Sequence, residues 1–294
     1  MRIKKLFILF LFVYFITTFV FTTQANAQSL STIQKAILNN LKTQSYYKIS
    51  SSNSVLVSYN KGKTYVNTHI ALTIDTWSGE PIQLSDQNVY VSKSVTAIIF
   101  VDSGSGATVY VSHDMCKTWT TTIIKAKSND PFTKGGYVPS YMDSYCVAYM
   151  NFTSSQTGYI IFGGEPAMSQ ENNYVYRTAN GGKSWYELPN ATDFYEHDII
   201  GGGFANYTNG FICFTPFDTI HGAIYATYDS GKTWKPLKMN YPSRYANSSL
   251  AASSPRFNGK YGLMPISYVD DAGNCSIFYM YSIDHGSTWH YLSK

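Results

Sequence analysis

The sequence has little charge, and this shortage excludes whole classes of partner. Asp, Glu, Lys and Arg make up 14% of the 294 residues. Beyond residue 27 there are 19 basic and 18 acidic residues, a formal net charge of +1. A near-neutral chain has no electrostatic footprint for nucleic acid or for an anionic membrane surface. We therefore expect no nucleic-acid partner.

Motifs that bind metals, phosphates or cofactors are also lacking. No pair of cysteines has C-x-x-C spacing, the histidines are isolated, and no acidic ladder of a calcium loop is found. Neither a Gly-rich phosphate loop nor a nucleophile elbow occurs. We expect no metal and no cofactor. Four cysteines are present, Cys116, Cys146, Cys213 and Cys275, which permit two disulfides in any of three pairings or four thiols.

The N-terminal segment reads as a secretory signal peptide. Basic residues at positions 2, 4 and 5 precede an apolar run over residues 6–21, and Ala25-Asn26-Ala27 supplies a cleavage pattern. Sixteen helical residues span about 24 Å, less than a hydrocarbon core of about 30 Å. We predict cleavage before Gln28 and a secreted or cell-envelope location, with a retained anchor as the alternative. The mature chain has no other membrane-spanning stretch, and we expect a monomer.

An eight-residue signature recurs five times beyond residue 57. The clearest copies are Ser112-His113-Asp114-Met115-Cys116-Lys117-Thr118-Trp119 and the segments at 178–185, 227–234 and 282–289; a weaker copy occupies 58–65. Each has a hydroxyl, then Asp or Asn two residues later, and ends in Thr or Ser and an aromatic residue. The final aromatic residues are 54, 66, 49 and 55 positions apart. A period near fifty residues is typical of propeller blades.

Between the signatures the texture is that of β-strands. Runs at 96–100, 158–162, 210–214 and 262–266 precede strands at 108–112, 174–178, 223–227 and 276–282, each of which leads into a signature. We predict an all-β propeller of four-stranded antiparallel blades, five being favoured and six or seven the alternatives. Apolar residues at helical spacing predict one helix over residues 30–43. The expected domains are a signal peptide at 1–27, a helical segment at 28–45 and a propeller at 46–294.

The signature is expected to hold a turn between the third and fourth strands of each blade. The short side chain at its third position accepts backbone N–H bonds, glycine permits a positive φ, and the aromatic ring covers the turn. The residues given this structural role are Asn60, Asp114, Trp119, Asn180, Trp185, Asp229, Trp234, Asp284 and Trp289. Cys116 and Lys117 stand where the second copy should have its glycine, so we expect that turn to have a different shape.

These repeats resemble those of the Asp-box, or BNR-repeat, superfamily, which includes sialidases, the sortilin ectodomain and photosystem II assembly-factor-like proteins. Residues 158–162 and 175–185 are most similar to the last group. The resemblance implies a propeller but no single activity. In sialidases three arginines converge on the substrate carboxylate. Here Arg177 adjoins a signature and Arg256 lies near a turn at the same end of the blades, whereas Arg244 lies in a loop at the opposite end. This separation, and the lack of the Arg-Ile-Pro motif of sialidases, disfavour sialidase activity.

The face opposite the signatures is the predicted binding face, because it carries the longer connections and loops on a rigid scaffold often bind ligands. The candidate residues there are Tyr137, Tyr141, Glu165, Tyr195, Asp218, His221, Tyr241, Arg244 and Tyr245. The sequence favours a secreted, non-catalytic binding or scaffold module for a glycan or protein partner. An extracellular glycoside hydrolase, with Glu165 and Asp218 as a candidate acid pair, and an envelope assembly factor are the alternatives.

Overall fold

The computed structural model describes residues 30–42, 46–75, 78–102, 106–125, 145–164, 173–189, 198–216, 221–270 and 272–293. The chain divides into a short unit of residues 1–36 and a unit of residues 37–294 that contains every strand. The helix α2 (Thr32–Leu41) begins in the first unit. Ser31 and Gln34 form a capping box at its start, because the backbone N–H of each donates to the side chain of the other.

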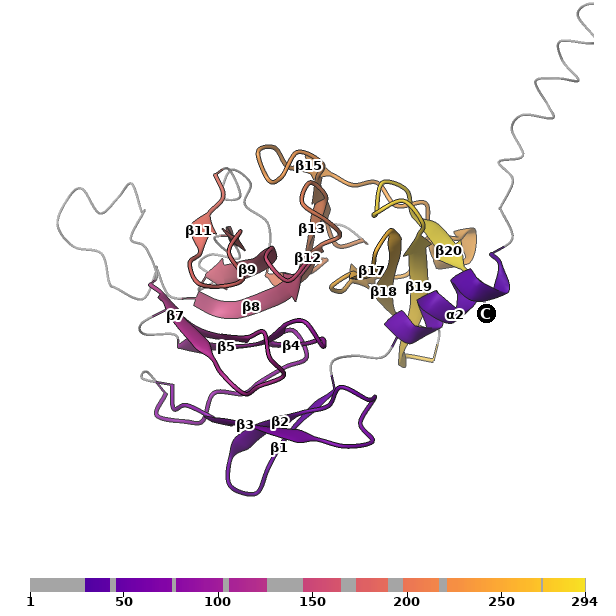
Figure 1. Ribbon diagram of the computed structural model, residues 1–294. Coiled ribbons are helices and arrows are strands. Elements are labelled where there is room, and N and C mark those ends of the chain that lie inside the picture. The colour runs from indigo at the N-terminus through magenta and orange to yellow at the C-terminus, as the bar shows by residue number, and fades with distance from the viewer. Residues whose placement is uncertain are drawn as a thin grey trace, which may run out of the picture. The chain divides into compact units, whose positions relative to one another are not determined.

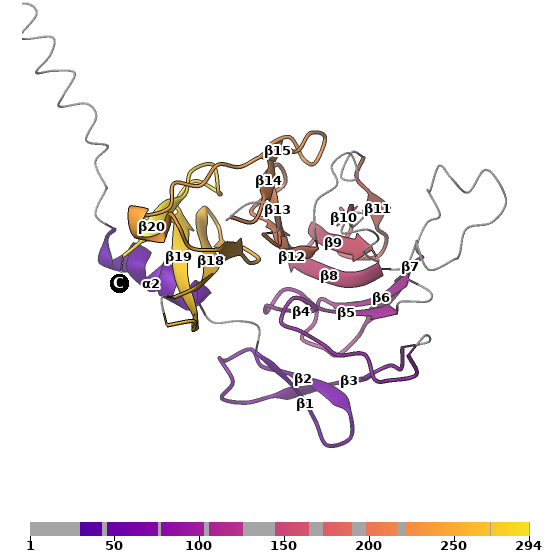
Figure 2. The same ribbon diagram turned by 180° about the vertical axis from the view of Figure 1, so that it is seen from behind.

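Five antiparallel sheets follow one another along the described chain (Figures 1 and 2). The first contains β1 (Tyr47–Ile49), β2 (Ser54–Val57) and β3 (Val66–Ala71); the second β4 (Val89–Val91), β5 (Thr96–Asp102), β6 (Gly106–Ser112) and β7 (Thr120–Ile124). The third contains β8 (Tyr145–Phe152), β9 (Gly158–Gly164), β10 (Asn173–Thr178) and β11 (Tyr186–Glu187); the fourth β12 (Ile199–Phe204), β13 (Gly210–Phe214), β14 (Ile224–Thr227) and β15 (Lys235–Pro236). The fifth contains β16 (Leu250–Ala252), β17 (Arg256–Asn258), β18 (Tyr261–Val269), β19 (Cys275–Ser282) and β20 (His290–Leu292), and a 3₁₀ turn, η3 (Ser243–Tyr245), precedes it.

The all-β architecture predicted from the sequence is confirmed. The four runs expected as second strands fall in β5, β9, β13 and β18, and the strands expected before the signatures are β6, β10, β14 and β19. Second strands such as β9 and β13 are buried along their whole length, as their unbroken apolar sequences require. The helix is found within the predicted 30–43.

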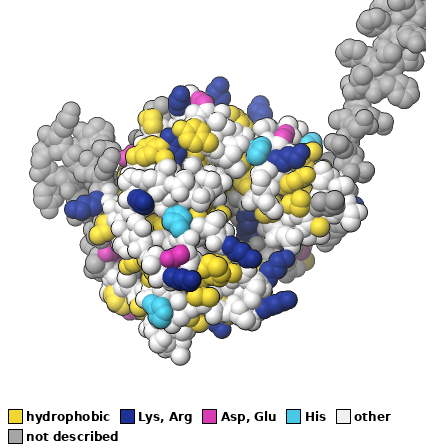
Figure 3. All heavy atoms as spheres, in the orientation of Figure 1, with side chains coloured by type: hydrophobic (Ala, Val, Ile, Leu, Met, Phe, Trp, Pro, Cys, Tyr) yellow, Lys and Arg dark blue, Asp and Glu magenta, His cyan; other side chains and the backbone are white. Residues whose placement is uncertain are grey.

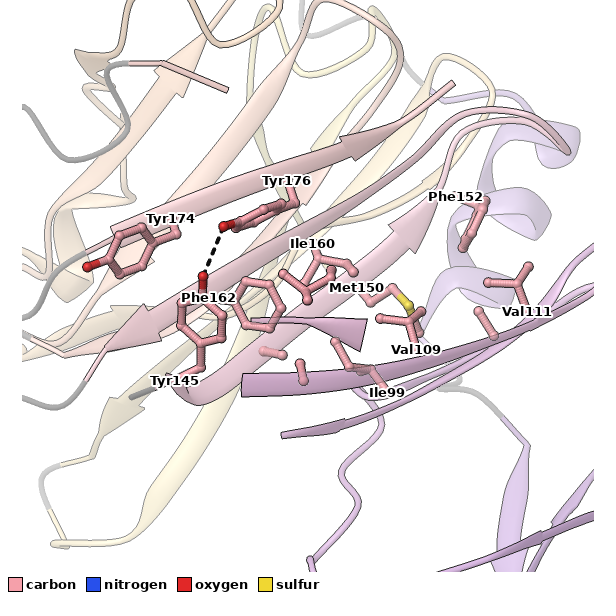
Figure 4. Close-up of a cluster of buried hydrophobic side chains, with 14 of the residues drawn as sticks. Ile99, Val109, Val111, Tyr145, Met150, Phe152, Ile160, Phe162, Tyr174 and Tyr176 are labelled. Atoms are coloured by element: carbon pink, nitrogen blue, oxygen red, sulfur yellow. Dashed lines mark hydrogen bonds between the residues drawn. The ribbon is translucent and has the colours of Figure 1, made fainter. Parts of the chain in front are cut away.

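The core lies between neighbouring sheets rather than within any one of them. Four clusters of buried side chains join the first sheet to the second, the second to the third, the third to the fourth and the fourth to the fifth. Figure 4 shows the second of these, in which Ile99 and Val109 face Met150 and Ile160. The buried hydroxyls of Tyr145 and Tyr176 satisfy one another at 3.0 Å. Sheets stacked face to face in this way are the packing of a propeller.

Each signature forms the turn between the last two strands of its sheet. In the fourth copy, Asp229 Oδ1 accepts from the backbone N–H of Thr233 at 2.9 Å and Oδ2 from its hydroxyl at 2.7 Å. The Thr227 hydroxyl accepts the N–H of Gly231 at 2.9 Å and donates to Asp229. Asn60 and Asn180 replace the second carboxylate oxygen with an amide that donates to Thr64 and Ser184.

The second signature has the same turn, so the expectation of a different shape was wrong. Cys116 donates its backbone N–H to the Ser112 hydroxyl at 2.9 Å, as glycine does in the other copies. Met115 and Cys116 both adopt left-handed backbone conformations, with φ of 59° and 70°. The hydrogen bonds of the turn therefore compensate for the cost of a left-handed cysteine.

Signatures also link one sheet to the next. The second residue of the first copy, Tyr59, hydrogen-bonds Cys116 in the second copy at 3.0 Å. His113 bonds the Gly181 carbonyl in the third copy at 2.8 Å, and Tyr228 donates to the Gly286 carbonyl in the fifth at 3.3 Å. Position two of these copies thus acts between sheets, while positions one and three hold the turn.

Among the described residues the first sheet has three strands, one fewer than the second, third and fourth. Residues just before it contact both the first sheet and the fifth. Arg256, on β17 of the fifth sheet, donates to the carbonyls of Leu41 and Lys42 at 3.1 and 3.0 Å. Asn40 accepts from Lys61, in the first signature, at 2.9 Å. Residues 40–42, which we call the clasp, therefore join the first sheet to the fifth.

All four cysteines lie in described segments and are thiols, so the disulfide alternative is not the one found. Cys116 and Cys213 are buried, whereas Cys146 and Cys275 are exposed. Burial raises the pKa of the Cys213 thiol to about 12.

Candidate functional site

The signature carboxylates are fully engaged in their own turns. Hydrogen bonds from the Thr118 side chain and backbone lower the pKa of Asp114 to about 2, and bonds from the Thr233 backbone and side chain do the same for Asp229. For Asp284, partial burial acts to raise the pKa, but hydrogen bonds from Thr288 outweigh it and lower the pKa. The hydrogen bonds of these carboxylates therefore serve to hold the turns.

Two clefts are formed where the inner strands of the sheets meet. Their strands are β4, β8, β12 and β16–β17, each the first strand of its sheet. One cleft, of about 510 Å³, lies at the strand ends next to the signatures and is lined by residues such as Phe152, Phe204 and Phe257. The other, of about 730 Å³, lies at the opposite strand ends. We call them the signature-side cleft and the far-side cleft; Gln87 lines both.

The signature-side cleft is lined by one acidic and one basic side chain, Asp86 and Arg256. Burial raises the pKa of Asp86, and the positive charge of Arg256 partly offsets this. Burial lowers the pKa of Arg256, and the charge of Asp86 counteracts it. Because Arg256 donates to the carbonyls of the clasp, its main role is structural.

The far-side cleft combines hydrogen-bonding groups with apolar walls. Asp75, Glu80 and Gln83, from the segment between β3 and β4, line it. Tyr149 and Ile82 contribute flat or aliphatic surface. A mixed lining of this kind suits a polar ligand that also has apolar faces.

Irregularities in two inner strands fall at this cleft. The register of β8 shifts between Tyr145 and Val147, and that of β12 shifts between Ile199 and Gly201. The residues in between, Cys146 and Ile200, both line the far-side cleft. Bulges re-aim side chains and are enriched beside functional sites. Two such register shifts therefore occur at the same ends of successive inner strands, and both contribute residues to this cleft.

Of the candidate residues predicted from the sequence, five lie outside the described residues: Tyr137, Tyr141, Glu165, Tyr195 and Asp218. The other four gather near the fifth sheet. His221 packs edge-on against Tyr241 with ring centroids 5.0 Å apart, and the Arg244 guanidinium lies 4.7 Å from the centre of the Tyr245 ring. None of these four lines either cleft.

Tyr245 is a core residue rather than an exposed binding platform. Its side chain is 8% exposed and stacks on Phe278 with centroids 4.2 Å apart. Tyr241 is half-buried against the same cluster, and burial raises its pKa. The reason is that η3 turns this segment back onto the sheet, so that its aromatic side chains face inwards.

Sequence reasoning missed the loop over residues 72–88, which supplies Asp75, Glu80 and Asp86. The length of this segment could not be predicted, because the strands of the first repeat are hard to place from the sequence. The bulged residues Cys146 and Ile200 were missed as well, because a bulge depends on pairing with a neighbouring strand and has no mark in the sequence. The fold decides the composition of both clefts.

A family model now places this chain among known proteins. The model of the DUF6242 beta propeller domain matches residues 9–256. The chain belongs to this family. Among curated proteins, none matches its sequence. The family description agrees with the sheets described above and gives the fold without an activity.

Solved structures with a similar fold share little sequence with this DUF6242 domain. An endo-arabinase from Bacteroides thetaiotaomicron VPI-5482 is 15% identical over 76% of this chain and 84% of that chain, with a TM-score of 0.45. A protein of unknown function from Dyadobacter fermentans DSM 18053 is 14% identical over 86% and 70%, with a TM-score of 0.47. The GH74 xyloglucanase from Xanthomonas campestris is 15% identical over 85% and 35%, with a TM-score of 0.40.

Metal-binding groups and membrane-spanning helices are both absent from the described residues. These contain no group of three or more His, Cys, Asp or Glu able to hold a metal ion. No helix among them is long and apolar enough to cross a membrane. On the face shown in Figure 3, basic and acidic side chains are dispersed among polar and hydrophobic ones, in keeping with the low charge content.

Proposed function

We propose that this propeller is an exported, non-catalytic binding module that takes a glycan at the far-side cleft. The observation that carries the proposal is that two register shifts, at Cys146 and Ile200, fall in a cleft that Asp75 and Glu80 also line. Sugars present hydroxyls along their edges and C–H groups on their faces, so carboxylates and amides beside apolar walls complement both. The cleft lies on the face that the sequence assigned to binding.

The first test is a glycan array probed with the mature chain and with two cleft variants. Ile200→Asp places a charge on the apolar wall, and Glu80→Gln removes a hydrogen-bond acceptor. We expect Glu80→Gln to weaken binding of the array hits by roughly tenfold, the value of one charge-assisted hydrogen bond. Ile200→Asp should weaken it at least as much, because the ligand would have to desolvate the new charge. Ile277→Asp is the matched control, because Ile277 is exposed and lies outside both clefts.

Labelling of Cys146, which lines the cleft, gives a second test. In a Cys275→Ser background, maleimide should label Cys146, since the other two cysteines are buried. A bound glycan should slow this labelling, and labelled protein should no longer bind it. Labelling of Cys275 in a Cys146→Ser background should have neither effect. Glycan binding that survives both Ile200→Asp and modification of Cys146 would rule out this cleft.

A glycoside hydrolase is the second candidate, because two carboxylates, Asp75 and Glu80, lie on the wall of one cleft. Such enzymes use two carboxyl groups on either side of the scissile bond. A chromogenic glycoside screen tests it directly. Turnover that Glu80→Gln and Asp75→Asn each abolish would favour the enzyme, and absence of turnover of every glycan bound on the array would leave the binding module.

A further inference from the structure

Three arginines follow the expected signal peptide, and two of them lie between pairs of tyrosines. Arg177, on β10, has its guanidinium carbon 4.9 Å from the ring centre of Tyr186 and 4.3 Å from that of Tyr207. Its Nε donates to the Tyr186 hydroxyl. Arg244 is placed in the same way between Tyr245 and Tyr291. The two arrangements allow a direct comparison.

The Arg177 arrangement leaves its aromatic rings open to solvent. Tyr207 is 53% exposed and Tyr186 41% exposed, whereas Tyr245 beside Arg244 is buried. Tyr207 lies in the turn between β12 and β13, and its carbonyl accepts a hydrogen bond from the buried Tyr159 at 3.1 Å. The two exposed rings come from neighbouring sheets, and both are held in place on a rigid framework.

The guanidinium of Arg177 has no acidic partner in the described part of the chain. Partial burial acts to lower its pKa, but the hydrogen bond from Arg177 to Tyr186 and the nearby tyrosine hydroxyls outweigh it, so that the pKa is raised. A fixed, half-buried positive charge that has no acidic neighbour among the described residues attracts an anion. A guanidinium also presents several N–H donors in one plane, which suits a carboxylate or sulfate.

We infer that Arg177, Tyr186 and Tyr207 form a second carbohydrate site, specific for anionic sugars. The guanidinium binds the carboxylate or sulfate group, and the exposed ring of Tyr207 packs against the C–H face of the same sugar. The site lies beside the third signature, at the opposite strand ends from the far-side cleft, and does not depend on it.

The test measures the affinity of the mature chain for three oligosaccharides of matched length: an oligogalacturonate, a sulfated oligogalactan and a neutral oligogalactan. We expect measurable binding of at least one anionic oligosaccharide, weakening as salt is raised, and none of the neutral one at this site. Comparison of the first two distinguishes carboxylate from sulfate recognition. Failure of both to bind would overturn the inference.

Variants assign the binding to these residues. Arg177→Gln should weaken it roughly tenfold or more, and Tyr207→Ala by several-fold, with unchanged thermal unfolding. Tyr207→Phe should retain binding, because the ring rather than the hydroxyl makes the contact. Arg244→Gln is the control for general loss of positive charge; an equal effect there would contradict a specific site. Ile200→Asp should leave anionic binding intact, and dependence on it would assign the ligand to the far-side cleft instead.

Discussion

At the scale of the residue, the fifth position of the signature is set by the sheet that precedes it. A Cβ on Gly182 would lie 2.5 Å from Val111, and one on Gly231 would lie 2.8 Å from Leu188. The second signature faces the smaller first sheet, where Cys116 fits and bonds Tyr59. Glycine is therefore required by packing as well as by backbone conformation, and the exception occurs where the packing is different.

The aspartate at the third position of the signature should make the stability of the protein depend on pH in the acidic range. Asp229 has a folded-state pKa of about 2, below its ordinary value of 3.8, so its contribution to stability is complete above about pH 4 and is lost as pH falls through 2. Asp229→Asn should keep the turn, since Asn60 and Asn180 form the same one. We expect the variant to lose less stability than the wild type between pH 4 and pH 2 in urea titrations; equal loss would contradict this account.

The tryptophan that ends the signature should contribute strongly to the stability of the fold. Trp234 packs edge-on against Phe204, with ring centroids 6.1 Å apart, and is half-buried. We expect Trp234→Ala to lower the free energy of unfolding by about 3 kcal/mol, the lower end for a truncated aromatic side chain. Trp234→Phe should cost less because it keeps a ring against Phe204. A loss below about 1 kcal/mol in chemical denaturation would show that the ring does not hold the turn.

At the scale of the element, three sheets share a unit of phenylalanine, glycine and tryptophan. The phenylalanines Phe152, Phe204 and Phe257 come near the end of the first strand, and their rings lie over Gly158, Gly210 and Gly262 at the start of the second. The signature tryptophans pack edge-on against these rings: Trp185 on Phe152, Trp234 on Phe204 and Trp289 on Phe257. Glycine at the start of these strands therefore leaves the room that each aromatic ring occupies.

Substitution of one such glycine tests the unit. In Gly210→Ala, the new methyl group would lie 2.5 Å from the Phe204 ring, which is held by Trp234 and by stacking on Tyr159 at 3.7 Å. We expect a loss of about 2 kcal/mol, typical of overpacking. Gly203→Ala is the matched control, since its nearest neighbours lie at 3.4 Å. Similar unfolding free energies for the two variants would exclude the steric explanation.

At the scale of the molecule, the clasp makes contacts that connect the two ends of the sequence. The bonds from Arg256 to Leu41 and Lys42 join residues more than two hundred positions apart. Neighbouring sheets elsewhere share a buried cluster, but between the first sheet and the fifth these polar contacts take that place. These hydrogen bonds, together with the Lys42 ammonium 5.1 Å from the centre of the Tyr279 ring, therefore contribute to the closure of the series of sheets.

Removal of this closure should destabilise both ends of the fold. Arg256→Ala leaves two carbonyls without their charged donor, and we expect a loss of about 2 kcal/mol. Hydrogen exchange should rise in the first and fifth sheets together, while the buried strand β9 stays protected. Arg256→Lys restores the charge without the forked geometry and should recover part of the loss. Faster exchange confined to the fifth sheet would argue against a clasp.

The sequence by itself determined what depends on neighbours along the chain. The signature turns, the second strands and the helix are specified by hydrogen bonds within eight residues and by local apolar patterns, which is why their positions were predicted closely. The tertiary structure alone decided which residues share a cleft, because that depends on strand register, on bulges and on how loops fold back. It moved Tyr245 into the core and placed Asp75, Glu80, Cys146 and Ile200 together. Closure by Arg256 is likewise tertiary, since its partners Leu41 and Lys42 lie more than two hundred positions away in the sequence.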